Sequence, residues 1–210
     1  MKQVNKVISI GANCLSLDFS KFLGIREKSP VDNFSGFNIW KAPALFTKEF
    51  KKDLFRSSYK TRKATDFELK RYYFNKKVFD FEKGFSIVHN DFESRRFRHS
   101  LKKRIRIFHK YYKKSLTDDS LWYVYSLDKM DAGLNENSLF RIKNELPKNV
   151  VSHLIILAIR TKNPLFKKYF NYYVELDGEE KYRWGDKSQG IEIADILEKQ
   201  YQIKINYEKE

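Results

Sequence analysis

Residues 151–159 read VSHLIILAI and residues 4–10 read VNKVISI, and these two stretches decide the fold. Both are short runs rich in aliphatic side chains, as expected for strands that are covered on both faces. Residues 92–114 show the other pattern, because apolar side chains recur there every three or four positions, as in a helix. Buried strands that alternate with helices predict an α/β fold with a largely parallel sheet flanked by helices.

The chain has 210 residues, without a repeat, a low-complexity linker or a change of composition, so we expect a single domain over residues 1–210. A strand at 4–10 and a helix at 15–23 form its first unit. The following stretch, approximately residues 25–85, is longer than a simple crossover and has helical spacing over 39–55. We expect it to form a helical cap or insertion after the first strand-helix unit.

The composition excludes several classes of protein. The chain has 42 Lys and Arg against 27 Asp and Glu, a formal net charge of +15, and one Cys. A single Cys excludes an internal disulfide framework and a cysteine-only zinc site. No stretch approaches the roughly 18 apolar residues of a membrane helix, and residues 1–22 lack the core of a signal peptide. We therefore expect a cytoplasmic protein without a membrane span, in which Cys14 is a reduced thiol.

Cys14 follows the first predicted strand directly, in the sequence GANC. Ligands of open α/β sheets bind outside the carboxyl ends of the strands. The N–H groups of a helix start favour a thiolate and can stabilise an oxyanion. Gly11 permits a sharp turn, and the Asn13 side chain can donate a further hydrogen bond. These residues fit a cysteine nucleophile, and the alternative is a small buried Cys beside a helix-capping Asn.

A thiolate nucleophile needs a general base, and His89 is the best placed of the four His residues. It ends the strand-like segment FSIVH and stands, like Cys14, at a strand-to-helix junction. If this strand is parallel to the first, both junctions lie at one edge of the sheet. Asp91 or Asp32 would then orient the imidazole. The alternatives are a helix N-cap for Asp91 and a turn residue for Asp32.

Five short motifs occur in a definite order along the chain: GANC at 11–14, SPVDNF at 29–34, VHNDF at 88–92, a basic helix at 99–114 and LWYVYSL at 121–127. In this order they resemble an uncharacterised family of bacterial proteins described as papain-like cysteine peptidases. The resemblance covers roughly residues 7–130 and implies Cys14 as the nucleophile and His89 as the general base. The sequence departs from the family pattern at Val31 and Asn33, where Phe and Trp are expected, and at the inserted Asn90.

The densest basic segment contains ten Lys and Arg residues and one acidic residue, between Glu93 and Lys114. Arg is suited to bidentate recognition of phosphate and carboxylate groups. Because this helix follows His89, we expect Arg95, Arg96 and Arg98 to reach the active edge of the sheet and bind an anionic substrate. The alternative is a solvated helix face.

The sequence thus predicts a cysteine-nucleophile hydrolase of the peptidase or amidase type, acting on a peptide, a glycan or an anionic small molecule. One alternative is a Cys-dependent acyltransferase of surface-polysaccharide biosynthesis that uses a coenzyme A thioester. Another is a non-catalytic basic module for nucleic acid or another polyanion, although no nucleic-acid-binding signature favours it. The sequence has no phosphate-binding loop and no grouped metal ligands, so we expect no metal and, outside the acyltransferase alternative, no cofactor.

Overall fold

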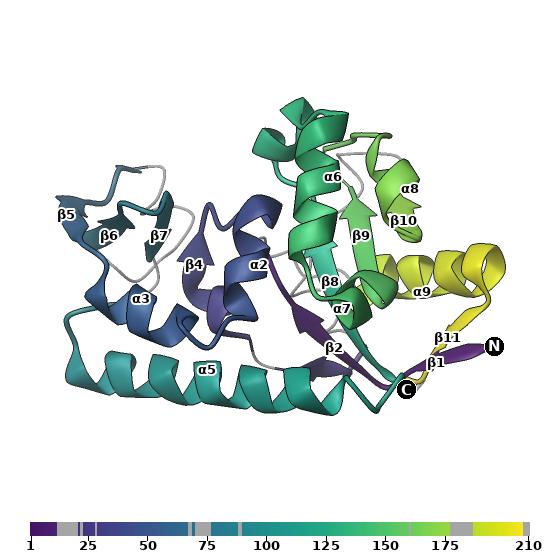
Figure 1. Cartoon of the computed structure of the whole chain (residues 1–210), viewed down its shortest axis with the longest axis horizontal. Coiled ribbons are helices and arrows are strands. Elements are labelled where there is room, and N and C mark those ends of the chain that lie inside the picture. Colours follow the sequence, from purple (N-terminus) through teal and green to yellow (C-terminus); the bar gives the residue numbers. More distant parts are fainter. Residues whose placement is uncertain are drawn as a thin grey trace.

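The computed structural model describes residues 1–11, 21, 23–27, 29–66, 69, 77–87, 90–159, 161–176 and 187–207. It confirms the predicted α/β class (Figure 1). The central sheet has five strands: β2 (Lys6–Ser9), β3 (Arg26–Glu27), β8 (Leu121–Ser126), β9 (Leu154–Ala158) and β10 (Tyr172–Glu175). Their order is β10-β9-β8-β2-β3, and every neighbouring pair is parallel.

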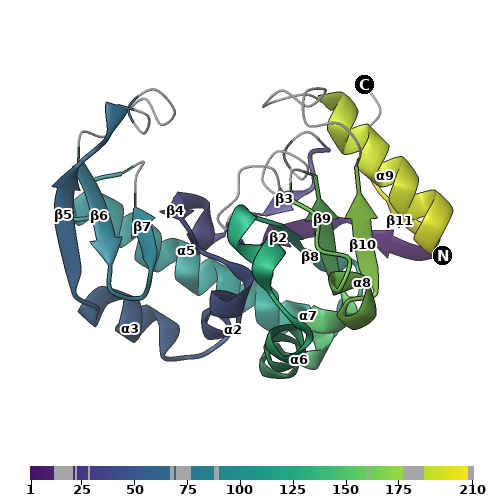
Figure 2. The same ribbon diagram turned by 90° about the horizontal axis from the view of Figure 1, so that it is seen from above.

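Helices cover both faces of the central sheet, as the continuous apolar strands predict. One face packs against α5 (Arg95–Lys114), α6 (Glu136–Glu145) and α7 (Lys148–Ser152), and the other packs against α9 (Lys187–Tyr201). Figure 2 shows α6 and α7 on one side of the strands and α9 on the other. Every residue of β8 and β9 is buried, so these strands show no polar face in the sequence.

The two stretches that decide the fold are interrupted in the structure. Residues 4–10 are divided at Asn5, because β1 (Lys2–Val4) leaves the central sheet and pairs in parallel with β11 (Ile203–Ile205). The predicted strand at 151–159 begins only at Leu154, since α7 extends to Ser152. The His153 ring then ends this helix through a 2.9 Å hydrogen bond between Nδ1 and the carbonyl oxygen of Asn149.

The insertion after β3 is mixed rather than helical. Its helical elements are η1 (Pro30–Asn33), η2 (Ile39–Lys41), α2 (Ala42–Leu45) and α3 (Phe50–Arg56). Its strands are β4 (Phe34–Ser35), β5 (Tyr59–Lys63), β6 (Lys77–Phe81) and β7 (Phe85–Ile87), which form an antiparallel sheet in the order β4-β7-β6-β5. Aromatic packing favours this sheet, because the ring of Phe81 stacks on Phe85 at 4.8 Å and meets Phe92 edge-on at 5.0 Å.

The strand order creates a switch point between β2 and β8. The chain adds β3 on one side of β2 and then β8, β9 and β10 on the other. In sheets with this order, ligands bind in the crevice outside the carboxyl ends of the strands at the switch point. Here those ends are followed by Gly11 and by η3 (Lys129–Gly133). Within the described residues, no helix has both the length and the apolar character needed to cross a bilayer.

Candidate functional site

Gly11 leaves the carboxyl end of β2 at the switch point. A Cβ atom at this position would lie 2.5 Å from two carbons of the Tyr125 ring, so only glycine fits against this strand. We expected Gly11 to allow a sharp turn, but its φ is not in the left-handed region. The glycine is therefore explained by its close approach to Tyr125. The Ser9 hydroxyl adds a 2.8 Å hydrogen bond to the Gly11 carbonyl oxygen.

A buried carboxyl group lies beneath this contact. The Tyr125 hydroxyl and the Asp128 N–H each donate a 2.7 Å hydrogen bond to Oδ2 of Asp131 in η3. Burial raises the pKa of Asp131 to about 6, although both donors favour the carboxylate. Carboxyl groups with such shifts are enriched at functional sites. Asp131 was not among the predicted site residues. The sequence feature that could have pointed to it is the acidic segment SLDKMDAG, which directly follows the buried strand β8.

Asn163 ties the loop after β9 to the loop after β8. Its side-chain nitrogen donates to the carbonyl oxygens of Asp131 and Leu134 at 2.9 and 3.0 Å, and its Oδ1 accepts from the Leu165 N–H at 3.1 Å. The side chain is buried. A buried amide with its donors and acceptor satisfied holds both loops in one arrangement. The edge of the sheet beside Gly11 is therefore preorganised.

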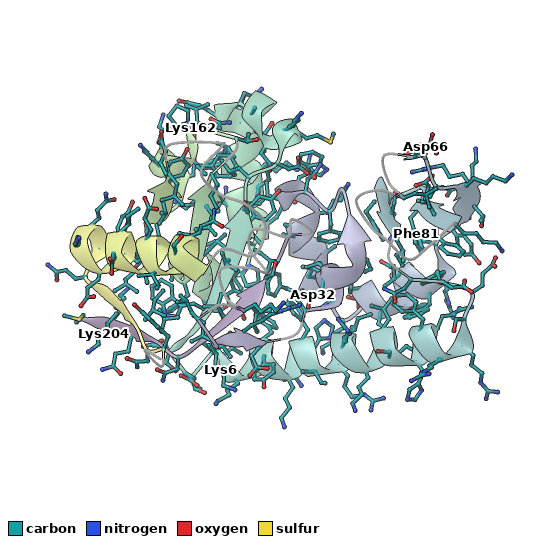
Figure 3. The ribbon with its side chains drawn as sticks, turned by 180° about the vertical axis from the view of Figure 1, so that it is seen from behind. Lys6, Asp32, Asp66, Phe81, Lys162 and Lys204 are labelled. Carbon is teal, nitrogen blue, oxygen red and sulfur yellow. The ribbon has the colours of Figure 1, made fainter. Side chains whose placement is uncertain are left out.

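Asp32 lies in η1, directly beyond the carboxyl end of β3. Its Oδ2 accepts hydrogen bonds from Nη2 of Arg26 at 2.7 Å and from the Ser29 N–H at 3.1 Å, and Arg104 approaches it from α5 at 3.8 Å. Burial raises the pKa of Asp32, against the opposing effect of these three groups. Its Oδ1 has no hydrogen-bond partner among the described residues. Figure 3 shows Asp32 between the two sheets, above α5.

The strand β7 ends beside β4, the strand that directly follows η1. The pairing of Cys14 with His89 was argued on the condition that this strand is parallel to the first, and the condition is not met, because β7 belongs to the antiparallel sheet and pairs with β4. The register joins Phe34 to Ile87 and Ser35 to Ser86, so β7 ends beside the start of β4. The strand β4 follows η1 directly, and η1 follows β3, the parallel neighbour of β2, so the end of β7 is linked through β4 and η1 to the carboxyl edge of the central sheet.

Three of the predicted site residues, Asn13, Cys14 and His89, lie outside the described residues. Asp91 is described and exposed, and its Oδ1 accepts a 2.9 Å hydrogen bond from the Glu93 N–H. It does not cap α5, because the N-cap is Ser94. Asp91 therefore stabilises the turn before the helix.

Arg95, Arg96 and Arg98 lie away from the switch point. With their neighbours on α5 they line an open surface hollow of about 740 Å³. The Arg98 guanidinium lies 5.5 and 5.4 Å from the ring centres of Phe55 and Phe92, beneath the insertion. The opposite end of α5 meets the central sheet, where Ser115 bonds the Tyr123 hydroxyl at 2.8 Å. Figure 1 shows one end of α5 below the insertion and its other end near the central sheet. The structure thus separates these arginines from the edge that they were expected to reach.

A groove of about 470 Å³ lies beside η3. Its apolar walls come from η2, η3 and α6, and its lining consists of Trp40, Met130, Gly133, Leu134, Ile142 and the polar residues Ser138, Arg141 and Glu145. Met130 is 61% exposed and adjoins Asp131 in the chain, so the groove begins next to the buried carboxyl group. A pocket of this size and composition suits an uncharged organic group. The groove is accordingly the best candidate for binding the apolar part of a substrate at this edge.

No group of three His, Cys, Asp or Glu side chains within the described residues is arranged to hold a metal ion. Comparison of the chain with protein-family models, with curated proteins and with solved structures finds no match. The chemistry of this edge must therefore be argued from its own residues.

Proposed function

We propose that this protein is a cysteine-nucleophile hydrolase in which His89 activates Cys14 and Asp32 orients His89. The proposal rests on the placement of three strands: β2 and β3 are parallel neighbours, and β7 ends beside Phe34, which directly follows η1. Cys14 follows the first of these strands, Asp32 follows the second, and His89 follows the third. The order of motifs that resembles the cysteine peptidases points to the same pair.

Covalent geometry supports the approach of the two side chains. Consecutive Cα atoms are about 3.8 Å apart, so Cys14 has a reach of at most about 11 Å from Gly11. By the same argument His89 has a reach of at most about 8 Å from Ile87. Ile87 is paired with Phe34, which directly follows η1, and Gly11 follows β2, the parallel neighbour of β3. We propose that the thiol and the imidazole on these two short segments meet beside η1.

Asp32 is the better of the two orienting candidates. In the sequence, Asp32 stands two residues before Phe34 and His89 two residues after Ile87, and Phe34 and Ile87 are paired in the sheet. Oδ2 of Asp32 is held by Arg26 and Ser29, while Oδ1 has no partner in the described part of the chain. A fixed carboxylate with one available oxygen suits an imidazole Nδ1–H. Asp91 is exposed and already accepts from the Glu93 N–H.

The proposed reaction is acyl transfer through a thioester. His89 takes the proton of the Cys14 thiol, and the sulfur attacks the substrate carbonyl carbon. The tetrahedral oxyanion is held by backbone N–H groups after Gly11 and by the Asn13 amide. His89 then gives the proton to the leaving group as its bond to carbon breaks. Water, deprotonated by His89, attacks the thioester, releases the acid and returns the proton to Cys14.

The position of the arginines favours hydrolysis over transfer from coenzyme A. Coenzyme A carries phosphate groups that need cationic partners near the reacting thioester. Arg95, Arg96 and Arg98 lie under the antiparallel sheet, at the other end of α5 from β8. The groove beside η3 has apolar walls that include Trp40 and Met130, and the one arginine in its lining, Arg141, is paired with Glu145. We infer an ester or amide substrate with an apolar acyl group.

The decisive measurement is the pH dependence of alkylation by iodoacetamide. Cys14 is the only cysteine, so the label reports this thiol alone. We expect an apparent pKa below about 7.5, because an activated thiol titrates below the free value near 8.5. His89→Ala and Asp32→Asn should return it towards that value, and Asp91→Asn should not. A wild-type thiol that titrates near about 8.5 would contradict the proposal.

Disulfide trapping tests the proximity of the two residues independently of activity. In the His89→Cys variant, mild oxidation should join position 89 to Cys14, because a disulfide needs Cα atoms within about 7 Å. Glu93→Cys, on an exposed residue two positions before α5, is the control and should stay reduced. Equal trapping in both variants, or trapping in neither, would reject the Cys14–His89 pair.

A further inference from the structure

A small, well-defined cavity lies at the other end of the β4–β7 pair, away from Asp32. Its volume is about 120 Å³. Its floor consists of buried apolar side chains: Phe37, Phe50, Leu54 and Phe85. Its rim is polar or small: Lys41, Ala44, Asp53 and Lys83. Apolar walls with a few charged groups at the mouth are the usual composition of a small-molecule site.

The floor has the shape and size for a single aromatic ring. Phe37 meets Phe50 and Phe85 edge-on, with ring centres 6.5 and 5.6 Å apart. Such faces and edges pack well against a further ring. The volume is slightly below the roughly 150 Å³ of an engineered apolar cavity that holds benzene. A ligand with one ring would fill the floor and leave its polar group at the rim.

Lys41 supplies a cation at that rim. Its Nζ donates to the carbonyl oxygen of Gly36 at 2.6 Å and to that of Gly84. Both glycines have positive φ, so these turns hold their carbonyl oxygens in fixed positions. An ammonium group has three donors, so one remains after these two bonds. The ammonium group is therefore positioned by the fold, with a donor to spare.

The charge of Lys41 is only weakly compensated. Its side chain is half-buried, and no carboxylate in the described ranges forms an ion pair with it. Burial lowers the pKa of Lys41, against the opposing charge of Asp131. The other charges of the rim balance each other, because Lys83 pairs with Asp53 at 3.6 Å. A desolvated ammonium group without a close counter-ion gains from binding an anion.

We propose that this cavity binds a small aromatic carboxylate, with its ring on the phenylalanine floor and its carboxylate on Lys41. The class of ligand follows from the volume of the cavity, which is that of one ring, and from Lys41, the one cation of the rim without an ion-pair partner among the described residues. The cavity shares no lining residue with the groove beside η3, and its occupancy does not depend on the proposed hydrolase activity.

Fluorine NMR titration of the full chain tests the proposal with 4-fluorobenzoate and its neutral match, 4-fluorobenzyl alcohol. We expect the carboxylate to bind about tenfold more tightly, as a charge-assisted hydrogen bond predicts. Lys41→Met should remove this preference and leave the alcohol unaffected. Lys51→Met, on an exposed lysine of α3 that does not line the cavity, should change neither affinity.

A second variant keeps the test valid if the loss of Lys41 disturbs the two glycine turns. Ala44 is an exposed rim residue, so Ala44→Phe should block the mouth without altering the core, and both probes should lose binding. Equal binding of the two probes to the wild type would overturn the carboxylate assignment. Absence of binding to the wild type, or binding that survives Ala44→Phe, would overturn the site itself.

Discussion

Arg26 donates a 2.7 Å hydrogen bond to the carboxylate of Asp32, and this ion pair joins the edge strand β3 to the turn that begins the insertion. Arg104 reaches the same carboxylate from α5 at 3.8 Å. The Asp32 side chain is only 4% exposed, so its charge depends on these partners. One carboxylate thus holds the junction between the central sheet, the insertion and the long helix.

Replacement of Asp32 by Asn should destabilise the protein by about 2 kcal/mol, because it leaves Arg26 and Arg104 without their shared carboxylate. Urea unfolding of the two proteins measures the difference. Asp91→Asn is the matched control, and we expect a change within about 0.5 kcal/mol, as for exposed side chains. Equal losses in the two variants would show that the ion pair does not hold the junction.

Replacement of Gly11 by Ala should cost about 2 kcal/mol of unfolding free energy, because the new Cβ would overlap the Tyr125 ring. Gly133→Ala is the control, since a Cβ there meets nothing within 4 Å. Thermal and urea unfolding of both variants provide the test. A stable Gly11→Ala protein would mean that β8 can move away from the segment after β2, and that the switch point is not rigid.

Asp131 should make the stability depend on pH. Burial raises its pKa in the folded protein from the ordinary 3.8 to about 6, so the folded state holds the proton more tightly than the unfolded chain. The stabilisation is complete below the ordinary value and is lost as the pH rises through about 6. Relative to Asp131→Asn, the wild type should therefore lose on the order of 3 kcal/mol between pH 4 and about pH 7.

Urea unfolding at several pH values measures this difference, and groups common to both proteins cancel in it. Asp66→Asn, which removes an exposed carboxylate, controls for the change of net charge. A difference between wild type and Asp131→Asn that stays constant from pH 4 to about pH 7 would contradict the burial of an ionisable carboxyl group at this position.

Arg95→Ala and Arg96→Ala should leave the alkylation profile of Cys14 unchanged. Arg104, which approaches Asp32, lies nine residues after Arg95 on α5, so the two are about 14 Å apart along the helix axis, and salt screens charges beyond about 8 Å. The titration described for His89→Ala serves as the positive control. A clear shift of the thiol pKa in either arginine variant would place the start of α5 near the nucleophile after all.

The sequence predicted those features that rest on local pattern. The buried strands, the amphipathic helix α5 and the length of the insertion follow from periodicity, which each segment carries by itself. Asp32 was also a candidate before the structure, although its partners Arg26 and Arg104 were not foreseen. Asp131 was missed, because the acidic segment after β8 is visible in the sequence but the burial of one of its carboxyl groups is not. The arginines of α5 were misplaced, since the direction of that helix depends on the sheet that precedes it.

By itself, the sequence determined the α/β class, the lone thiol after the first strand and the density of positive charge on one helix. Hydrophobic period and residue chemistry are properties of neighbouring residues, so no tertiary contact is needed to recognise them. Only the tertiary structure decided that β7 is antiparallel and pairs with β4, so that β7 ends beside the segment that links it through η1 to β3. Strand pairing depends on contacts between residues far apart in the chain, and no local pattern specifies which partner a short strand will find.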